Sequence, residues 1–355
     1  MGSHKLLGAL FLLAIASSVL AYDPSPLQDF CVGDPNSPVS VNGLVCKNPA
    51  HVNNKDFIFK GKFNLPGNTS NRLGSIVTPS FVPQFPALNT MGVAMARLDF
   101  ALGGVNPLHA HPRASEILIA YKEPWDLAVF PQGLIHFQVN IGRVPVVAFV
   151  GLSSQNPGVI TFANDVFIEW MINKTVNGFP CKNRTTVTAD DFFFAAGFHR
   201  PGNTSNALGF AVTPATVLEF PGLNTLGISM VRIDFALNGV LNPLHTHPRA
   251  SELLVLLRGV LFVGFVTSNP ENRLFSQIIN PGDLFVFPRT LIHFQLSIGR
   301  ELAFALSGLN SQNPGVITIA NAIFGTNPPI ANPLLRRAFR INDRIINILR
   351  APFAP

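Results

Sequence analysis

The stretch HTHPRASE, from His245 to Glu252, decides the fold of this chain, because a near-identical stretch, HAHPRASE, runs from His109 to Glu116. Internal repeats of this kind indicate duplicated structural units. Other stretches recur around the pair, namely PGNTSN at Pro66 and Pro201, LIHFQ at Leu134 and Leu291, and SQNPGVIT at Ser154 and Ser311. The offset is 136 residues at the histidine stretch (109 to 245) but 157 residues after it (134 to 291), so copy 1 lacks 21 residues that copy 2 has.

The composition predicts an all-β fold in two domains. The 355 residues are 47% apolar and 12% charged, which suits a folded chain of this length with two cores. Short apolar runs bounded by Gly, Pro or Asn are typical of strands, as at Ile228–Phe235, Leu253–Leu257, Val260–Val266 and Leu284–Phe287. We predict two β-jelly-roll barrels in tandem, copy 1 over residues 22–170 and copy 2 over residues 171–355, with a helical segment at Asn332–Arg350.

The 21-residue gap falls between Glu116 and Pro131, where copy 1 loses the counterpart of Val260–Val266 and part of what precedes Leu284. Losing a hairpin opens the barrel edge and exposes unpaired backbone groups. We therefore expect copy 2 to dominate stability, with copy 1 partly folded or completed by another chain. Copy 1 keeps the front end and copy 2 the back end of a complete unit, a layout that joining two neighbouring genes would also produce.

The N-terminus predicts export. Lys5 precedes the apolar run Leu6–Ile15 and small residues up to Ala21, so residues 1–21 are interpreted as a signal peptide. No later run reaches the roughly 20 apolar residues that a bilayer requires, so we predict a secreted protein. In that compartment Cys31 and Cys46 can form a disulfide, leaving Cys181 as the odd cysteine. Four sequons are glycosylation candidates: Asn68, Asn173, Asn183 and Asn203.

The formal net charge of +6 allows two kinds of polyanionic partner. A modest cluster of basic residues occurs near the C-terminus, at Arg336, Arg337, Arg340 and Arg344, but no nucleic-acid-binding motif accompanies it. We therefore exclude nucleic acid and favour acidic cell-wall polysaccharide as the partner of a basic secreted protein.

The repeated histidines predict metal centres. His245 and His247 are two residues apart on a strand and face the same side, while Pro248 is expected to interrupt the strand and turn Glu252 toward them. His293, on a separate strand, is expected to complete the set from across the barrel. Three imidazoles and one carboxylate leave positions open on a six-coordinate metal such as manganese or iron. The copy 1 counterparts are His109, His111, Glu116 and His136.

The spacing G-x5-H-x-H-x4-E-x6-G from Gly239, followed by G-x5-P-x4-H from Gly282, resembles the two cupin motifs. The surrounding text, including VTADDFFF from Val187 and FPRTLIHFQ from Phe287, resembles plant germin-like proteins over essentially the whole mature chain. The resemblance implies cupin barrels, Mn²⁺ bound by both four-residue sets, apoplastic glycoproteins and hexamers built as trimers of dimers. Copy 1 departs from the motifs at Glu123 and Trp125, so the motifs do not decide whether copy 1 binds a metal ion.

For function, the resemblance implies superoxide dismutation by manganese and a role in plant defence or the cell wall. Oxalate oxidation fits less well, because the resemblance implies an Asn just before the Arg of the strand that leads to the first motif in oxalate-oxidising members. This chain has Ala96 before Arg97 and Val231 before Arg232. A second pocket Asn is matched by Asn106 and Asn242. The alternative is a non-catalytic metal-binding wall or receptor-like glycoprotein. Two other classes of two-copy cupin fit less well. Seed storage globulins generally lack the ligand set, which both copies here retain, and oxalate decarboxylases would have two complete barrels, whereas copy 1 is incomplete.

Overall fold

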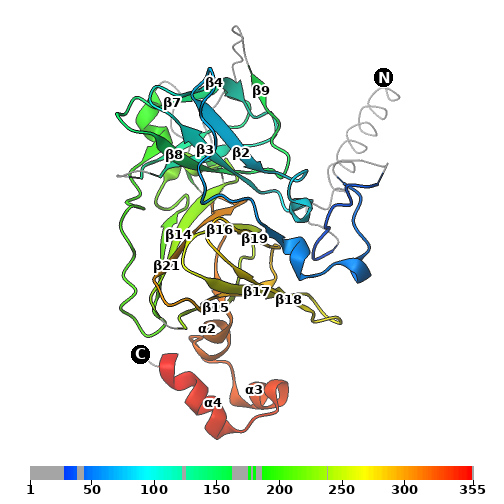
Figure 1. Cartoon of the computed structure of the whole chain (residues 1–355). Coiled ribbons are helices and arrows are strands. Elements are labelled where there is room, and N and C mark those ends of the chain that lie inside the picture. The colour runs from blue at the N-terminus through cyan, green and yellow to red at the C-terminus, as the bar shows by residue number, and fades with distance from the viewer. Residues whose placement is uncertain are drawn as a thin grey trace, which may run out of the picture.

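The computed structural model describes residues 28–37, 44–121, 125–161, 186–237 and 239–353, and the backbone of residues 175–176 and 179–180. The predicted signal peptide, Glu123, Cys181, Asn173 and Asn183 lie outside the described residues. Strands predominate over helices in the part of the chain that is described, as the composition predicts, and the two barrels lie one above the other in Figure 1. No helix in the described part is long and apolar enough to cross a bilayer.

Copy 2 forms a complete two-sheet jelly roll. Its larger sheet has the strand order β1-β19-β16-β21-β14-β13, with bounds Ile58–Phe59, Leu284–Phe287, Glu252–Arg258, Ala303–Leu309, Ser229–Phe235 and Phe210–Ala215. Its second sheet has the order β18-β17-β20-β15-β22, with bounds Leu274–Ile279, Leu261–Val266, Ile292–Ser297, Leu241–Thr246 and Ile317–Thr318. All pairings in the two sheets are antiparallel. Along each strand every second side chain points into the barrel interior between the two sheets.

Copy 1 repeats this plan with a shorter second sheet. Its larger sheet has the order β12-β6-β5-β8-β3-β2, with bounds Phe193–Phe194, Leu127–Phe130, Glu116–Ala120, Val146–Leu152, Ala94–Phe100 and Ser75–Ser80. Its second sheet has only the order β7-β4-β9 in the described residues, with bounds His136–Val139, Val105–Ala110 and Ile160–Thr161. The β17–β18 hairpin of copy 2 has no counterpart there, as the 21-residue gap predicts.

The missing hairpin uncovers the β7 edge of copy 1. Leu134, just before β7, is 52% exposed, whereas its counterpart Leu291 in copy 2 is 5% exposed. Phe137 on β7 is 58% exposed, and its counterpart Phe294 packs against Phe262 of β17 with ring centroids 5.5 Å apart. Copy 1 therefore has an open, apolar barrel edge among the described residues.

Each copy lends its first strand to the other copy, which the sequence did not predict. β1 precedes the copy 1 barrel but pairs with β19 of copy 2, where Ile58 lies opposite Phe285. β12 precedes the copy 2 barrel but pairs with β6 of copy 1, where Phe193 lies opposite Ala128. Positions 58 and 193 differ by the same 135 residues as the PGNTSN repeats, so the exchange is reciprocal.

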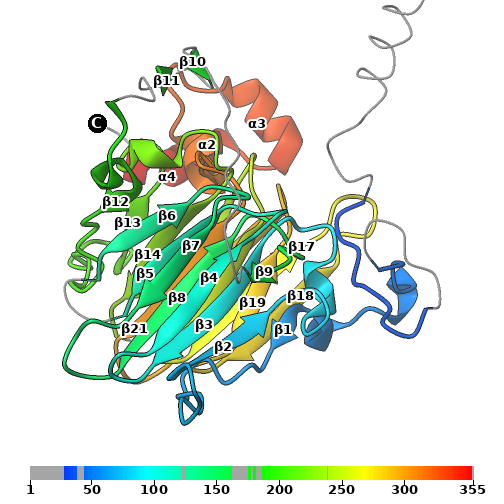
Figure 2. The same cartoon turned by 90° about the horizontal axis from the view of Figure 1, so that it is seen from above.

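This exchange corrects the expectation that copy 1 is partly folded. One continuous cluster of buried apolar side chains contains residues of both copies. The two larger sheets approach closely at paired glycines of β8 and β21: a Cβ added at Gly151 would lie 3.9 Å from the Gly308 Cα. Figure 2 shows the copy 1 strands lying over the copy 2 strands. Because the cores merge and β12 completes the copy 1 sheet, copy 1 folds with copy 2 of the same chain.

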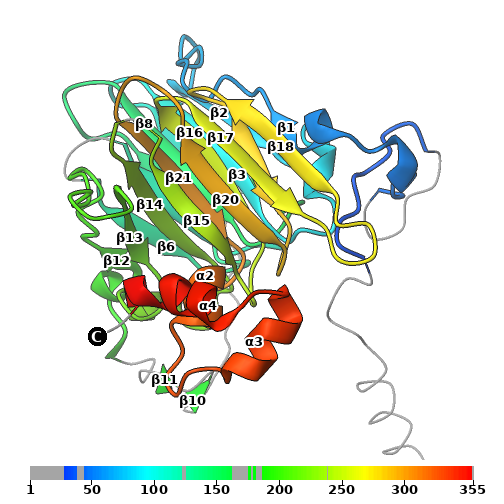
Figure 3. The ribbon, with the colours of Figure 1, turned by 90° about the horizontal axis from the view of Figure 1, so that it is seen from below.

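The ends of the chain are short helices and turns. The C-terminal segment contains α2 (Ile319–Phe324), α3 (Asn332–Phe339) and α4 (Asp343–Arg350), which lie at one end of the copy 2 barrel in Figure 3. The predicted helical segment is therefore present but broken between α3 and α4, where Arg340 has a left-handed φ of 56°. Single 3-10 turns occupy Pro49–His51, Asn54–Phe57, Pro86–Leu88, Ala189–Phe192, Pro221–Leu223 and Ala351–Phe353.

The predicted disulfide is confirmed: Cys31 and Cys46 are bonded in the front end of copy 1. This front end lies beside β18 of copy 2, as the blue and yellow segments of Figure 3 show. It also contacts its own copy, where the Gly33 N–H donates to Pro86 O at 2.8 Å and Asn89 Nδ2 donates to Leu44 O at 2.7 Å. The two described sequon residues, Asn68 and Asn203, are both exposed, and their glycosylation stays a prediction.

Candidate metal centres

Three strands bring the copy 2 ligand set together. His245 and His247 lie at the end of β15 and just beyond it, and His293 lies on the neighbouring strand β20, directly opposite His245. Glu252 begins β16 in the other sheet, after the turn that contains Pro248. The expectation that His293 approaches from across the barrel is wrong, because β15 and β20 are adjacent strands. It is Glu252 that crosses the interior.

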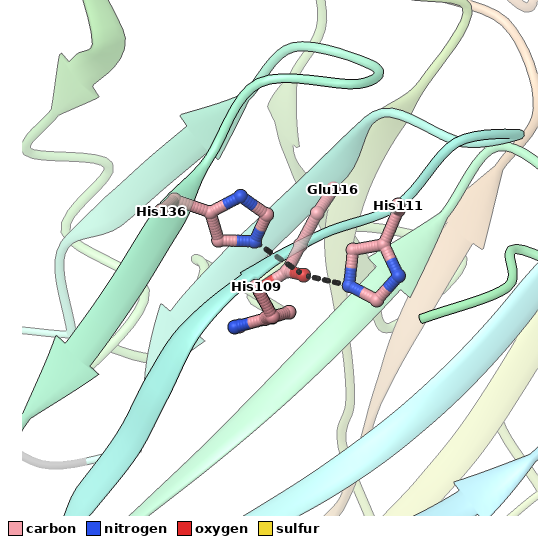
Figure 4. Close-up of side chains that lie close together, drawn as sticks. All are labelled: His109, His111, Glu116 and His136. Carbon is pink, nitrogen blue, oxygen red and sulfur yellow. Dashed lines mark hydrogen bonds and ion pairs between the residues drawn. The ribbon is translucent and has the colours of Figure 1, made fainter. Parts of the chain in front are cut away.

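Copy 1 brings together the corresponding four residues, which Figure 4 shows converging. His109 lies opposite His136 on β4 and β7, and Glu116 begins β5. In each centre all four side chains are buried, and the candidate ligand atoms lie within 4.8 Å of one another. The structure thus assembles both predicted sets, and no strand that carries a ligand is lost with the hairpin.

Backbone carbonyls fix the orientation of every histidine ring. In copy 2 the Nδ1 atoms lie 2.7 Å from Pro243 O, 2.7 Å from Gly315 O and 2.8 Å from Leu291 O. In copy 1 the corresponding partners are Pro107 O at 2.8 Å, Gly158 O at 2.6 Å and Leu134 O at 2.9 Å. A carbonyl can only accept, so Nδ1 carries the proton and Nε2 presents its lone pair to the centre.

The converging atoms suit a cation. In copy 2 Glu252 Oε2 lies 3.0 Å from His247 Nε2 and 3.3 Å from His293 Nε2. His293 Nε2 is buried, and its contact with Glu252 does not have the geometry of a hydrogen bond. Three imidazole lone pairs and a carboxylate in one buried space repel one another unless a proton or a metal ion lies between them. The donor set therefore fits a divalent metal, with nitrogen and oxygen ligands that manganese, iron or zinc accept.

The pKa values of His245 and Glu252 favour the protonation states that bind a metal ion. Burial, followed by the nearby His293, lowers the pKa of His245 to about 3, so this imidazole is neutral. Burial alone raises the pKa of Glu252, but in the metal-free centre the close contacts of its carboxylate with His247 and His293 outweigh burial and hold the pKa well below its ordinary value. Burial lowers the pKa of His247, but contact with the Glu252 carboxylate raises it by more, so the pKa lies above its ordinary value.

The copy 1 centre has the same electrostatic pattern. Its carboxylate Oε2 lies 2.9 Å from His111 Nε2 and 3.4 Å from His136 Nε2. Burial raises the pKa of Glu116, yet in the metal-free centre the contacts of its carboxylate with His111 and His136 outweigh burial and lower the pKa to about 2. The pKa of His109 is lowered, chiefly by burial. Both carboxylates are therefore ionised at neutral pH.

A small apolar cavity opens beside the copy 1 centre. Its volume is about 170 Å³, and its lining includes Ala96, Asn106, His109, Glu116 and Val150. Ala96 and Val150 are counterparts of Val231 and Ser307 in copy 2. Ala96 occupies the position at which an amide was expected of an oxalate-oxidising pocket, so that wall of the cavity offers no hydrogen-bond donor from this residue.

Trp125 explains how copy 1 tolerates one motif departure. It has a left-handed φ of 57°, and its counterpart Gly282 has a φ of 90°. Such a conformation in a non-glycine residue costs on the order of 1–3 kcal/mol. The Trp125 ring packs on Tyr121 with centroids 4.3 Å apart and lies 5.3 Å from the Arg232 guanidinium of copy 2. These contacts stabilise the strained residue and tie the copies together.

The sequence prediction missed the residues that bind the second oxygen of each carboxylate. Glu252 Oε1 accepts a hydrogen bond of 2.7 Å from Ser307 Oγ. Glu116 Oε1 accepts one of 3.1 Å from Gln138 Nε2. The signal for Gln138 was present, because it ends the repeated LIHFQ stretch two residues after His136. Ser307 carries no such signal, since its strand meets Glu252 only in the folded barrel.

Comparisons with known proteins agree with the cupin fold. The sequence matches the Cupin family over residues 62–122, 123–177 and 196–347. Germin-like protein 8-2 of Oryza sativa subsp. japonica is 57% identical over 179 residues, which are 50% of this chain and 80% of that protein. Germin-like protein subfamily 1 member 16 of Arabidopsis thaliana is 56% identical over 179 residues, again 50% of this chain and 80% of that protein.

Among solved structures, oxalate decarboxylase from Bacillus subtilis at pH 4.6 is similar with a TM-score of 0.57 and 13% identity, covering 78% of this chain and 81% of that chain. At this identity the likeness concerns the fold alone, that of two cupin barrels in one chain. The fold and the two histidine–glutamate centres define a two-copy cupin. The chain belongs to the cupin family and, within it, to the germin-like proteins.

Proposed function

We propose that this germin-like chain is a secreted manganese protein of the plant apoplast that dismutates superoxide at the copy 2 centre. The observation that carries the proposal is the convergence of three oriented imidazoles and one ionised carboxylate in each barrel. Four ligands leave two positions open on a six-coordinate manganese. A manganese held there supplies the one-electron steps by which two superoxide ions and two protons become O₂ and H₂O₂.

The chain's own residues would hold the metal in a fixed, partly charged environment. His245, His247 and His293 would each contribute a neutral Nε2, because a backbone carbonyl holds each Nδ1 proton. Glu252 would contribute one negative charge through Oε2. The rings are also held by packing, since Phe287 stacks on His293 with centroids 4.7 Å apart. A rigid ligand set of this kind accommodates two oxidation states with little rearrangement.

Oxalate oxidation is supported less well. Ala96 and Val231 provide no amide where a dicarboxylate would need a directional contact, and the loss of such a contact costs about 1–3 kcal/mol of binding. We therefore expect no oxalate turnover from either centre.

Metal analysis of the secreted full-length chain tests the proposal. We expect about two manganese ions per chain, superoxide dismutation, and the loss of one ion and of most activity in His245→Ala. His51→Ala, at an exposed histidine outside both centres, is the matched control. If each chain bound two ions of another metal and did not exchange them for manganese, the choice of manganese would be contradicted. Failure to bind any divalent ion would contradict the centres themselves.

A non-catalytic role is the second candidate. All eight candidate ligands are buried, so metal bound in the barrels would stabilise the fold whether or not substrate reaches it. Full manganese content without superoxide turnover would favour a metal-stabilised wall or receptor-like glycoprotein.

Partners and location follow the same proposal. We propose homo-oligomers, secretion and glycosylation as for other germin-like proteins, with a role in defence or the cell wall. The exposed Arg336, Arg337, Arg340 and Arg344 provide a basic surface suited to acidic wall polysaccharide. Salt-dependent binding to polygalacturonate, weakened when these four arginines are replaced, would support that partner.

A further inference from the structure

The two centres share a ligand set but differ in what hydrogen-bonds to the outer oxygen of the carboxylate. In copy 2 the donor is the Ser307 hydroxyl on β21. The counterpart of Ser307 on β8 is Val150, since Ser307 lies opposite Val231 and Val150 lies opposite Ala96. Valine has no donor, so the copy 1 carboxylate takes its hydrogen bond from Gln138 instead.

This exchange of donors changes the state of a buried glutamine. In both copies an asparagine Nδ2 fixes the glutamine carbonyl, at 2.6 Å between Asn242 and Gln295 and 2.7 Å between Asn106 and Gln138. The free end of each amide is therefore Nε2. In copy 1 Nε2 donates to Glu116. In copy 2 Gln295 is fully buried, and its Nε2 has no partner among the described residues.

An unpaired buried N–H is unfavourable, so its persistence calls for a ligand. Gln295 lies two residues after His293 on β20, and side chains two apart on a strand face the same side. Its Nε2 is thus directed into the barrel that holds the copy 2 centre. The chemistry that an N–H donor beside a cation recognises is a small anion with an acceptor atom.

We propose that Ser307 is a positioning residue that makes copy 2 the anion-binding centre: by donating to Glu252 it leaves the Gln295 N–H available to an anion on the metal. In copy 1 the equivalent N–H is engaged by Glu116, because Val150 cannot take over that role. The two centres then differ in exogenous ligand binding although their metal ligands are identical. This inference rests on the metal binding proposed above.

Azide titration of the manganese-loaded full chain tests the inference, with metal content measured first on every sample. Copy 2 is read alone in a His109→Ala/His136→Ala background, and copy 1 alone in a His245→Ala/His293→Ala background. In the copy 2 background we expect Ser307→Val to keep its manganese but bind azide about tenfold more weakly, because Gln295 turns to Glu252. Ser307→Thr, which keeps the hydroxyl, is expected to restore parental azide binding.

The reciprocal variant gives an independent reading. In the copy 1 background, Val150→Ser is expected to strengthen azide binding about tenfold by freeing Gln138. Azide affinities within about twofold of the parents in both valine–serine exchanges, at full manganese content, would overturn the inference. Loss of manganese in Ser307→Val would also overturn it, because Ser307 would then be required for the metal. Absence of manganese from the parents would instead contradict the proposed function.

Discussion

Asp29 and Ser268 lie 239 positions apart in the chain, yet the carboxylate of Asp29 accepts two hydrogen bonds of 2.7 Å from Ser268, one from its backbone N–H and one from its hydroxyl. Asp29 belongs to the disulfide-bonded front end of copy 1, and Ser268 to the turn between β17 and β18 of copy 2. Nearby, Arg273 donates to the Val52 carbonyl at 2.6 Å. The front end of one copy therefore docks on the hairpin of the other.

This contact relates the two truncations to each other. Copy 1 lacks the hairpin, and copy 2 has no sequence counterpart of the Cys31 stretch that would dock on it. The exchange of β1 and β12 is symmetric, so a front end of copy 2 would dock on a hairpin of copy 1, and both of these parts are missing. The front end of copy 1 and the hairpin of copy 2, which dock on each other, are both present. The truncations consequently leave no unmatched docking surface for the front end.

The Asp29–Ser268 contact is expected to couple the two copies weakly. Asp29→Ala and Ser268→Ala should each lower the free energy of unfolding by about 1 kcal/mol, and the double variant should cost less than their sum. Urea unfolding of the four proteins measures the coupling. Strict additivity would show that the contact does not contribute to docking.

The disulfide is expected to stabilise the docked front end. It closes a loop of 15 residues, so replacing Cys31 and Cys46 by serine should lower the free energy of unfolding by about 3 kcal/mol. Hydrogen exchange should show faster exchange at β18, where the front end lies, and no change at β2. Equal effects at both strands would contradict docking on copy 2.

Arg232 provides a test of burial. Its guanidinium forms a buried pair with Asp234 at 2.6 Å and donates to the Phe198 carbonyl. Arg232→Ala leaves a buried carboxylate unpaired and should cost about 3–5 kcal/mol of unfolding free energy. Arg258→Ala is the matched control, since its pair with Glu301 at 3.1 Å is more than half exposed and should contribute less than about 1 kcal/mol. Similar losses in the two variants would contradict this account.

Metal-free protein is expected to lose stability in acid through His245. Its pKa is about 3 in the folded protein and near 6.5 when unfolded, so the unfolded state binds the proton first. The stability present above pH 6.5 is thus lost as pH falls toward 3, by up to about 1.4 kcal/mol per pH unit. Chelator-treated His245→Gln should lose less stability between pH 7 and pH 4, as measured by urea unfolding. Parallel curves would show that His245 is not buried as a neutral group.

The open β7 edge is expected to bind hydrophobic probes and to promote association. Phe137→Lys should reduce binding of an apolar dye and slow aggregation, with less than about 1 kcal/mol change in unfolding free energy, because the side chain is largely exposed. Phe294→Lys, at the covered counterpart, should instead destabilise the protein by about 1–3 kcal/mol. Unchanged dye binding in Phe137→Lys would mean that another surface binds the dye.

The sequence by itself determined the repeat, the all-β class, the 21-residue gap and both four-residue ligand sets. These follow from local regularities: strand periodicity places His245 and His247 on one face, and a proline resets the chain before Glu252. The disulfide was also within reach, because few cysteines leave few pairings. Such features depend on spacing along the chain, which the sequence contains in full.

Only the tertiary structure decided which parts of the two copies lie together. The exchange of β1 and β12, the docking of Asp29 on Ser268 and the position of His293 beside His245 depend on long-range pairing, which the sequence pattern does not specify. The same holds for Ser307, whose hydroxyl meets Glu252 because β21 and β16 are neighbours in the sheet. Since strand order sets these contacts, the difference between two centres with identical ligands became visible only in the folded barrels.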